Sequence, residues 1–208
     1  MPFIGPPGRL AASFISGGKA MTEATDGGGG RRGRGWRIAG WGGAALLLLA
    51  PLVAMQLTDE VRWTASDFVF AGVLFGSVGL GLELAVRRTR NLAYRAAAGF
   101  ALAAGFLMTW INGAVGLIGG EAEAANALAL GVVAVAVIGA VAALGCPAGM
   151  ARAMAATALA QLLLPLLAWA QGVGSRVLAG APEVFALTAI FTGMWLLSAW
   201  LFRRAAAG

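Results

Sequence analysis

The sequence has no histidine and only one cysteine, and each scarcity excludes a class of chemistry. With Cys146 alone, the chain forms no disulfide within itself. Without histidine, the usual ligand sets of zinc, haem and di-iron centres are incomplete, and so are the catalytic sets in which histidine activates a nucleophile. We therefore expect no metal, no cofactor and no enzymatic activity.

Charged residues are also scarce, at 12% of 208 residues, whereas apolar residues make up 60% and the mean hydropathy is +0.82. The apolar residues fall in blocks of about 20, each long enough for one helix to cross a hydrocarbon core ~30 Å thick. Because lipid offers no partner for a free N–H or C=O, and the blocks lack the alternation of barrel strands, helices are required. The predicted spans are 38–56, 68–86, 96–118, 125–144, 153–170 and 184–202. The fold class is thus an all-α membrane protein, with a six-transmembrane-helix bundle over residues 37–204.

Residues 1–36 differ from the rest of the chain. They are rich in Gly, Pro, Ser and Arg, and they include the run GGGGRRGRG at 27–35. Such a composition buries too little apolar surface to fold, so we predict a disordered cytoplasmic tail. Met21 is an alternative start, because residues 1–20 resemble neither a signal peptide nor the segment that follows.

The arginines are segregated between the two sets of loops. Eleven of them fall on one side: Arg31, Arg32, Arg34, Arg37, Arg87, Arg88, Arg90, Arg95, Arg152, Arg203 and Arg204. The opposite loops hold Arg62 and Arg176 together with six carboxylates. By the positive-inside rule both termini are cytoplasmic, which requires an even number of spans.

The net charge of +6 is therefore an orientation signal, and we expect no nucleic-acid partner. The expected partner is the lipid bilayer itself. Anionic lipid would contact the arginines of the tail at about 1 kcal/mol each. These arginines are Arg31, Arg32, Arg34 and Arg37.

Glu83 is a candidate intramembrane polar position, because a carboxylate inside a span is costly and often functional. Arg87 follows it by four residues, and Arg95 opens the next span at the same membrane level. We favour an ion pair that holds the two spans together. The alternative is a proton or cation site.

Asn112 and Gln161 are the other two candidate polar positions. For Asn112 we favour an interhelical hydrogen bond, worth about 1 kcal/mol. Gln161 lies between Thr157 and Pro165 at spacings of four, and the ring of Pro165 crowds the carbonyl of Gln161. This predicts a kink at Pro165, with a role in lining a polar path as the alternative. The hydroxyl of Thr192 is expected to bond to the carbonyl four residues earlier.

Small residues form stripes on the second and third spans. The second span carries Gly72, Gly76 and Gly79 at helical spacing, and the third carries a matching stripe that includes Gly105 and Gly116. Because glycine lets another backbone approach closely, these stripes predict a tight hairpin between the two spans.

Several segments together resemble a group of small uncharacterised bacterial inner-membrane proteins, over about residues 50–130. The segments are Met55 to Trp63, Asp67-Phe68, Tyr94-Arg95 and Trp110 to Gly116, with Glu121 and Asn126. The resemblance implies that the acidic loop after the first span and the Trp110 segment belong to a recurring hairpin. It carries no activity with it. We expect the chain in the bacterial inner membrane.

Two functions are consistent with these features. We favour a non-enzymatic protein of structural or accessory type, which acts through helix packing with a membrane-protein partner or a second copy. The alternative is a small transporter or channel, in which Glu83, Asn112 and Gln161 line an internal polar path.

Overall fold

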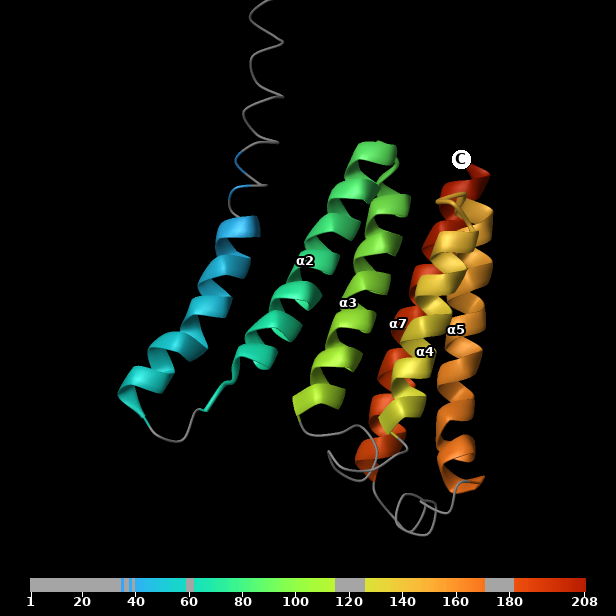
Figure 1. Ribbon diagram of the computed structural model, residues 1–208. Coiled ribbons are helices and arrows are strands. Elements are labelled where there is room, and N and C mark those ends of the chain that lie inside the picture. The colour runs from blue at the N-terminus through green and yellow to red at the C-terminus, as the bar shows by residue number, and fades with distance from the viewer. Residues whose placement is uncertain (1–34, 36–37, 39, 59–61, 115–125, 171–181) are drawn as a thin grey trace, which may run out of the picture. The chain divides into compact units, whose positions relative to one another are not determined.

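The computed structural model describes residues 35, 38, 40–58, 62–114, 126–170 and 182–208, and these residues form helices and no strand. The helices are Gly40–Leu57, α2 (Ala65–Arg88), α3 (Leu92–Ala114), α4 (Asn126–Ala142), α5 (Pro147–Ala168) and α7 (Pro182–Ala207) (Figure 1). All except α4 are long and apolar enough to cross a membrane, and α4 is an apolar helix of 17 residues. The predicted all-helical class is confirmed for the described residues, and five of their helices have the length and composition of membrane spans. Residues 1–34 and 36 of the predicted tail lie outside the described residues, as do Arg37 and Gly116.

The described chain divides into two units, Met1–Val69 and Phe70–Gly208. In the first unit, the start of α2 is fixed by local contacts. The Thr64 backbone N–H donates to Asp67 Oδ2 at 2.7 Å, and the rings of Trp63 and Phe68 meet edge to face at 5.2 Å. A carboxylate three residues into the helix and an apolar pair that brackets its first turn are typical start signals.

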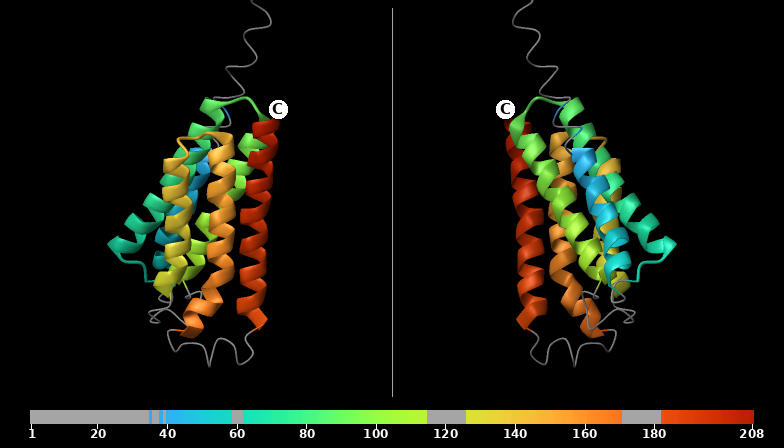
Figure 2. Two further views of the ribbon diagram at one scale, coloured as in Figure 1. Left: turned by 90° about the vertical axis from the view of Figure 1, so that its right-hand side faces the viewer. Right: turned by 90° about the vertical axis from the view of Figure 1, so that its left-hand side faces the viewer.

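In the second unit, α3, α4, α5 and α7 share one core, in which α5 packs against α4 and α7, and α3 packs against α7 and α4. Many of the fully buried positions are alanines, interleaved with a few large side chains. The large ones include Met108, Met154, Phe191, Trp195 and Phe202. The end of α2 and the beginnings of α3 and α5 lie at the same end of this unit as the C-terminus (Figure 2).

The hairpin of α4 and α5 is closely packed through glycine and alanine. A Cβ atom at Gly139 would lie 2.7 Å from Ala153 Cβ, and one at Gly149 would lie 2.9 Å from Ala143 Cβ. Such distances leave no room for a side chain, so glycine is required for this approach. The turn between the two helices uses positive φ angles at Leu144 (47°) and Gly145 (71°).

The contact between α2 and α3 lies on a different face from the one that the glycine stripes predicted. A Cβ atom at Gly72 or Gly76 would have no neighbour within 4 Å. The contact is made by Gly81, where a Cβ would lie 2.8 Å from Leu102 Cδ2, and by the ring of Phe75, which lies 5.2 Å from that of Phe106. The predicted pairing was therefore wrong, because aromatic side chains bury more surface than a glycine stripe offers.

The remaining glycines of the predicted stripes have other surroundings. A Cβ at Gly105 would face Trp195 of α7, at 3.8 Å, and Gly79 is half-buried within α2. The spacing identified small residues correctly but could not say which neighbour each one would meet.

Replacing Gly139 by leucine tests the α4–α5 contact. We expect a loss of about 1–3 kcal/mol in the free energy of unfolding, because the side chain must displace Ala153. Gly131→Leu is the matched control on α4, since a Cβ there would meet nothing within 4 Å. Thermal unfolding in detergent measures both variants, and equal melting temperatures would contradict the proposed role of Gly139.

Candidate functional site

Gln161 is the most deeply buried of the three candidate polar residues. Its side chain on α5 is 0% exposed, and neither amide atom has a hydrogen-bond partner among the described residues. Asn112 Oδ1 on α3 and Trp195 Nε1 on α7 are likewise buried atoms without a hydrogen-bond partner among those residues. A buried polar atom without a partner costs about 1–3 kcal/mol, so these positions call for a physical explanation.

Two of the buried hydroxyl groups donate hydrogen bonds to backbone carbonyls, and a third has no partner among the described residues. Thr157 Oγ1 donates to the Ala153 carbonyl oxygen at 2.9 Å, and Ser198 Oγ joins α7 to α3 by donating to the Ala97 carbonyl oxygen at 2.8 Å. The prediction for Thr192 was wrong, because its buried Oγ1 has no partner among the described residues.

Pro165 lies inside α5, which continues through it as far as Ala168. The kink expected there stays a prediction.

Glu83 pairs with Arg87, one turn further along α2, as its spacing predicts, but this pair lies within one helix and does not itself join the two spans. The Glu83 side chain is 16% exposed, so the pair lies at the margin of the packed region. Arg95 of α3 donates from Nη2 to the Val86 carbonyl and from Nε to the Thr89 carbonyl, each at 2.9 Å. Since the last carbonyls of a helix lack partners within it, Arg95 closes the end of α2 and fixes the α2–α3 hairpin there.

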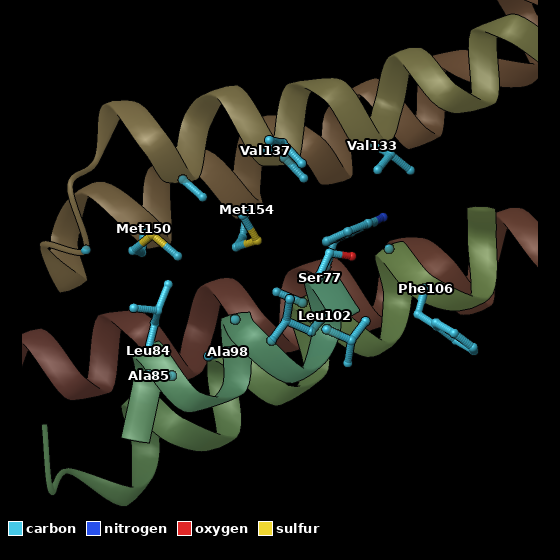
Figure 3. Close-up of a pocket in the computed structure, with 18 of the residues that line it drawn as sticks. Ser77, Leu84, Ala85, Ala98, Leu102, Phe106, Val133, Val137, Met150 and Met154 are labelled. Atoms are coloured by element: carbon cyan, nitrogen blue, oxygen red, sulfur yellow. The ribbon is translucent and has the colours of Figure 1, made fainter. Parts of the chain in front are cut away.

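A groove of about 690 Å³ lies within the second unit. One side is formed by α2 and α3 and the other by α4 and α5 (Figure 3). Its walls are mainly apolar. The wall residues include Leu84, Ala98 and Leu102 on one side, and Val133, Val137, Met150 and Met154 on the other.

None of the three predicted polar positions lines this groove. Glu83, Asn112 and Gln161 are all absent from its walls. The groove therefore does not connect them into one polar path, as the transporter hypothesis would require. The groove instead combines apolar walls with arginine side chains, Arg87 and Arg88, at one end.

The basic end of the groove is built around Gly145, in the turn between α4 and α5. Tyr94 Oη donates to the Gly145 carbonyl oxygen at 3.1 Å, and the Tyr94 ring meets Phe202 edge to face at 5.0 Å. The Arg88 side chain approaches from α2, and a Cβ atom at Gly145 would lie only 2.6 Å from Arg88 Nε. A glycine is therefore needed both for the positive φ and for the approach of Arg88.

Sequence reasoning used Arg88 only for the orientation and Tyr94 only for the family resemblance, and it did not place either residue, or Gly145, in a site. The signal for the turn was present, because Gly145 is followed by Cys146 and by Pro147, and proline is favoured at the first position of a helix. Nothing in the spacing indicated that Arg88 and Tyr94 meet this turn.

Cys146 is exposed beside this basic end and precedes the first residue of α5. The backbone N–H groups of Gly149 and then Ala148 bond to the thiol and lower its pKa below the ordinary value, and the positive charges of Arg152 and Arg88 act in the same direction. A thiol at a helix N-terminus is typically more acidic for this reason.

Comparison with known proteins does not extend these observations, since no family model, curated protein or solved structure matches the chain. Within the described ranges, no group of three or more Cys, Asp or Glu side chains is placed to hold a metal ion.

The lowered pKa of Cys146 has a measurable consequence. Because the thiolate is the reactive form, we expect the rate of alkylation to rise with pH through a midpoint below that of an ordinary cysteine, for which the pKa is about 8.5. Arg152→Gln should move the midpoint upward, since it removes a favourable charge. Iodoacetamide labelling of the single cysteine at a series of pH values measures both. An unshifted midpoint in the unaltered protein would refute the assignment.

Proposed function

We propose that the chain is a non-enzymatic integral membrane protein of structural or accessory type, which acts through helix packing. The burial of Gln161 is the observation that carries this proposal. This amide side chain is 0% exposed, and it lines neither the groove between α2–α3 and α4–α5 nor the pocket beside Arg152 and Arg203. A conduction path would need water or solute to reach such a residue.

The proposal includes six spans, with both termini in the cytoplasm of a bacterium and the helices in its inner membrane. For α4, the 17 described residues correspond to about 26 Å by helical rise, close to the ~30 Å of a hydrocarbon core. The arginines at the end of α2, in α3 and α5, and at the end of α7 support one basic side. Attaching a reporter enzyme to each terminus tests the orientation.

A second candidate function is a small transporter or channel. It is favoured by the polar atoms of Gln161, Asn112, Thr192 and Trp195, which have no partner among the described residues. Unsatisfied buried polar atoms are uncommon in proteins, and a bound water or ion is one explanation for them. The two functions make opposite predictions for Gln161.

Under the accessory function, Gln161→Leu should keep or raise the free energy of unfolding, by up to about 1–3 kcal/mol, because an unpartnered buried amide is replaced by an apolar side chain of similar size. Leu164→Ala is the comparison, since it empties a position that is also buried on α5 and should cost about 2–5 kcal/mol. Thermal unfolding in detergent gives both values. A Gln161→Leu variant as unstable as Leu164→Ala would instead support a structured polar site.

The accessory function also predicts a partner, either another membrane protein or a second copy. We infer that Gly72 and Gly76 serve this association rather than the contact with α3, since a Cβ at either position would meet no described atom within 4 Å. Gly76→Leu should therefore leave thermal unfolding of the purified chain unchanged, while at least halving recovery of the partner in mild detergent.

Gly81→Leu is the matched control for Gly76→Leu, because it fills the contact with Leu102 and should lower stability itself. Cross-linking and mass spectrometry of the purified material identify what is lost. Equal recovery of all partners from the Gly76→Leu variant would count against this surface. Contact of anionic lipid with the tail arginines, Arg31, Arg32, Arg34 and Arg37, remains part of the proposal.

A further inference from the structure

The groove between α2–α3 and α4–α5 is open along its apolar walls. Leu84 and Val137 both line it, yet their side chains are 59% and 56% exposed. An open apolar wall on a membrane helix faces hydrocarbon, so the groove is accessible to lipid from the side. Met150 and Met154 contribute flexible thioether side chains, which adapt to irregular apolar ligands.

The hydroxyl groups in the groove are already used. Ser77 Oγ donates to the Leu74 carbonyl at 2.8 Å, and Thr109 Oγ1 donates to the Gly105 carbonyl at 2.7 Å. Each bond lies within one helix, so neither hydroxyl has to be satisfied by a ligand. The groove therefore suits an apolar chain rather than a polar solute.

The dimensions fit one such chain. The wall runs from Leu74 to Arg88 on α2, which is about 21 Å by helical rise. One leaflet contributes about half of a hydrocarbon core of ~30 Å, so a lipid chain of that leaflet is accommodated. The volume of about 690 Å³ is in the range of sites that bind small molecules.

The two ends of the groove differ in charge. At the basic end, Arg87 is paired with Glu83, whereas no carboxylate of the described chain pairs with Arg88. Arg88 and Arg152 act together on the thiol of Cys146, so their positive charges converge there. An occupant with an apolar body and a negative end matches both features of the groove.

We propose that the groove binds one anionic phospholipid of the leaflet on the arginine-rich side, with an acyl chain between α2–α3 and α4–α5 and its phosphate at Arg88. A guanidinium pairs with phosphate oxygens through parallel hydrogen bonds, which gives the site its preference for a phosphate headgroup. This site is independent of the proposed partner surface at Gly72 and Gly76, and neither proposal requires the other.

The headgroup contact is tested by native mass spectrometry of the full chain with phosphatidylglycerol or phosphatidylcholine. We expect one retained phosphatidylglycerol per chain, and a drop of at least about tenfold in its affinity for Arg88→Gln, because hydrogen bonds to a charged group contribute about 1.5–3 kcal/mol. Arg90→Gln is the matched control, because Arg90 is exposed near the same end but does not line the groove. Equal losses in the two variants would mean general attraction to a basic surface and would overturn the proposal.

The acyl-chain contact is tested by filling the groove. Val137→Trp should abolish retention of phosphatidylglycerol, whereas Ile138→Trp should not, because Ile138 is 68% exposed on the same helix but does not line the groove. Thermal unfolding confirms that both variants are folded. If Val137→Trp retained the lipid but lost a co-purifying protein, the groove would belong to a partner helix instead.

The position of the bound lipid is measured through Cys146, the single cysteine of the chain. A bimane attached there should be quenched by phosphatidylglycerol that carries a nitroxide near its headgroup, and the quenching should fall in Val137→Trp but not in Ile138→Trp. Quenching that is identical in the two variants would place the lipid elsewhere on the surface and contradict the site.

Discussion

The close approach of helices through alanine and glycine is the constraint on which the second unit depends. In lipid, apolar side chains gain little by leaving their surroundings, so helix association relies on dense contact between surfaces. Gly139 against Ala153 and Gly149 against Ala143 bring α4 and α5 closer than any side chain would allow. The buried alanines of α3 and α5 continue this packing toward α7.

The same constraint explains why a groove exists. The core of α3, α4, α5 and α7 closes through small residues, whereas α2 contacts α3 through Phe75, Phe106 and Leu102. Larger side chains at that contact leave apolar surface between α2–α3 and α4–α5 uncovered. Arg95 and Tyr94 then fix the basic end, by bonding to backbone carbonyls of α2 and of the α4–α5 turn. Dense packing on one side and looser contact on the other leave an apolar groove with a basic end.

The candidate residues show where sequence reasoning holds. Glu83 and Arg87 pair as their spacing predicts, because residues four apart on a helix are neighbours whatever the rest of the chain does. The Thr157 hydroxyl donates to the carbonyl four residues earlier for the same reason. The Thr192 hydroxyl does not form this bond, although the same carbonyl position is within reach of a threonine on a helix. Contacts between helices were harder to predict from the sequence, since the glycine stripe of α2 identified a packing surface but not the helix that it meets.

The sequence by itself determined the helical class, the membrane character and the approximate positions of the helices, because these follow from hydropathy, length and the need to satisfy every backbone group in lipid. Only the tertiary structure decided that Gly139 and Gly149 let α4 and α5 approach closely, and that Arg88 and Tyr94 converge on Gly145. Residues 51 positions apart, such as Tyr94 and Gly145, meet only when helix rotation and depth are fixed. Those two quantities depend on how many side chains fit together at once, and no local pattern encodes them.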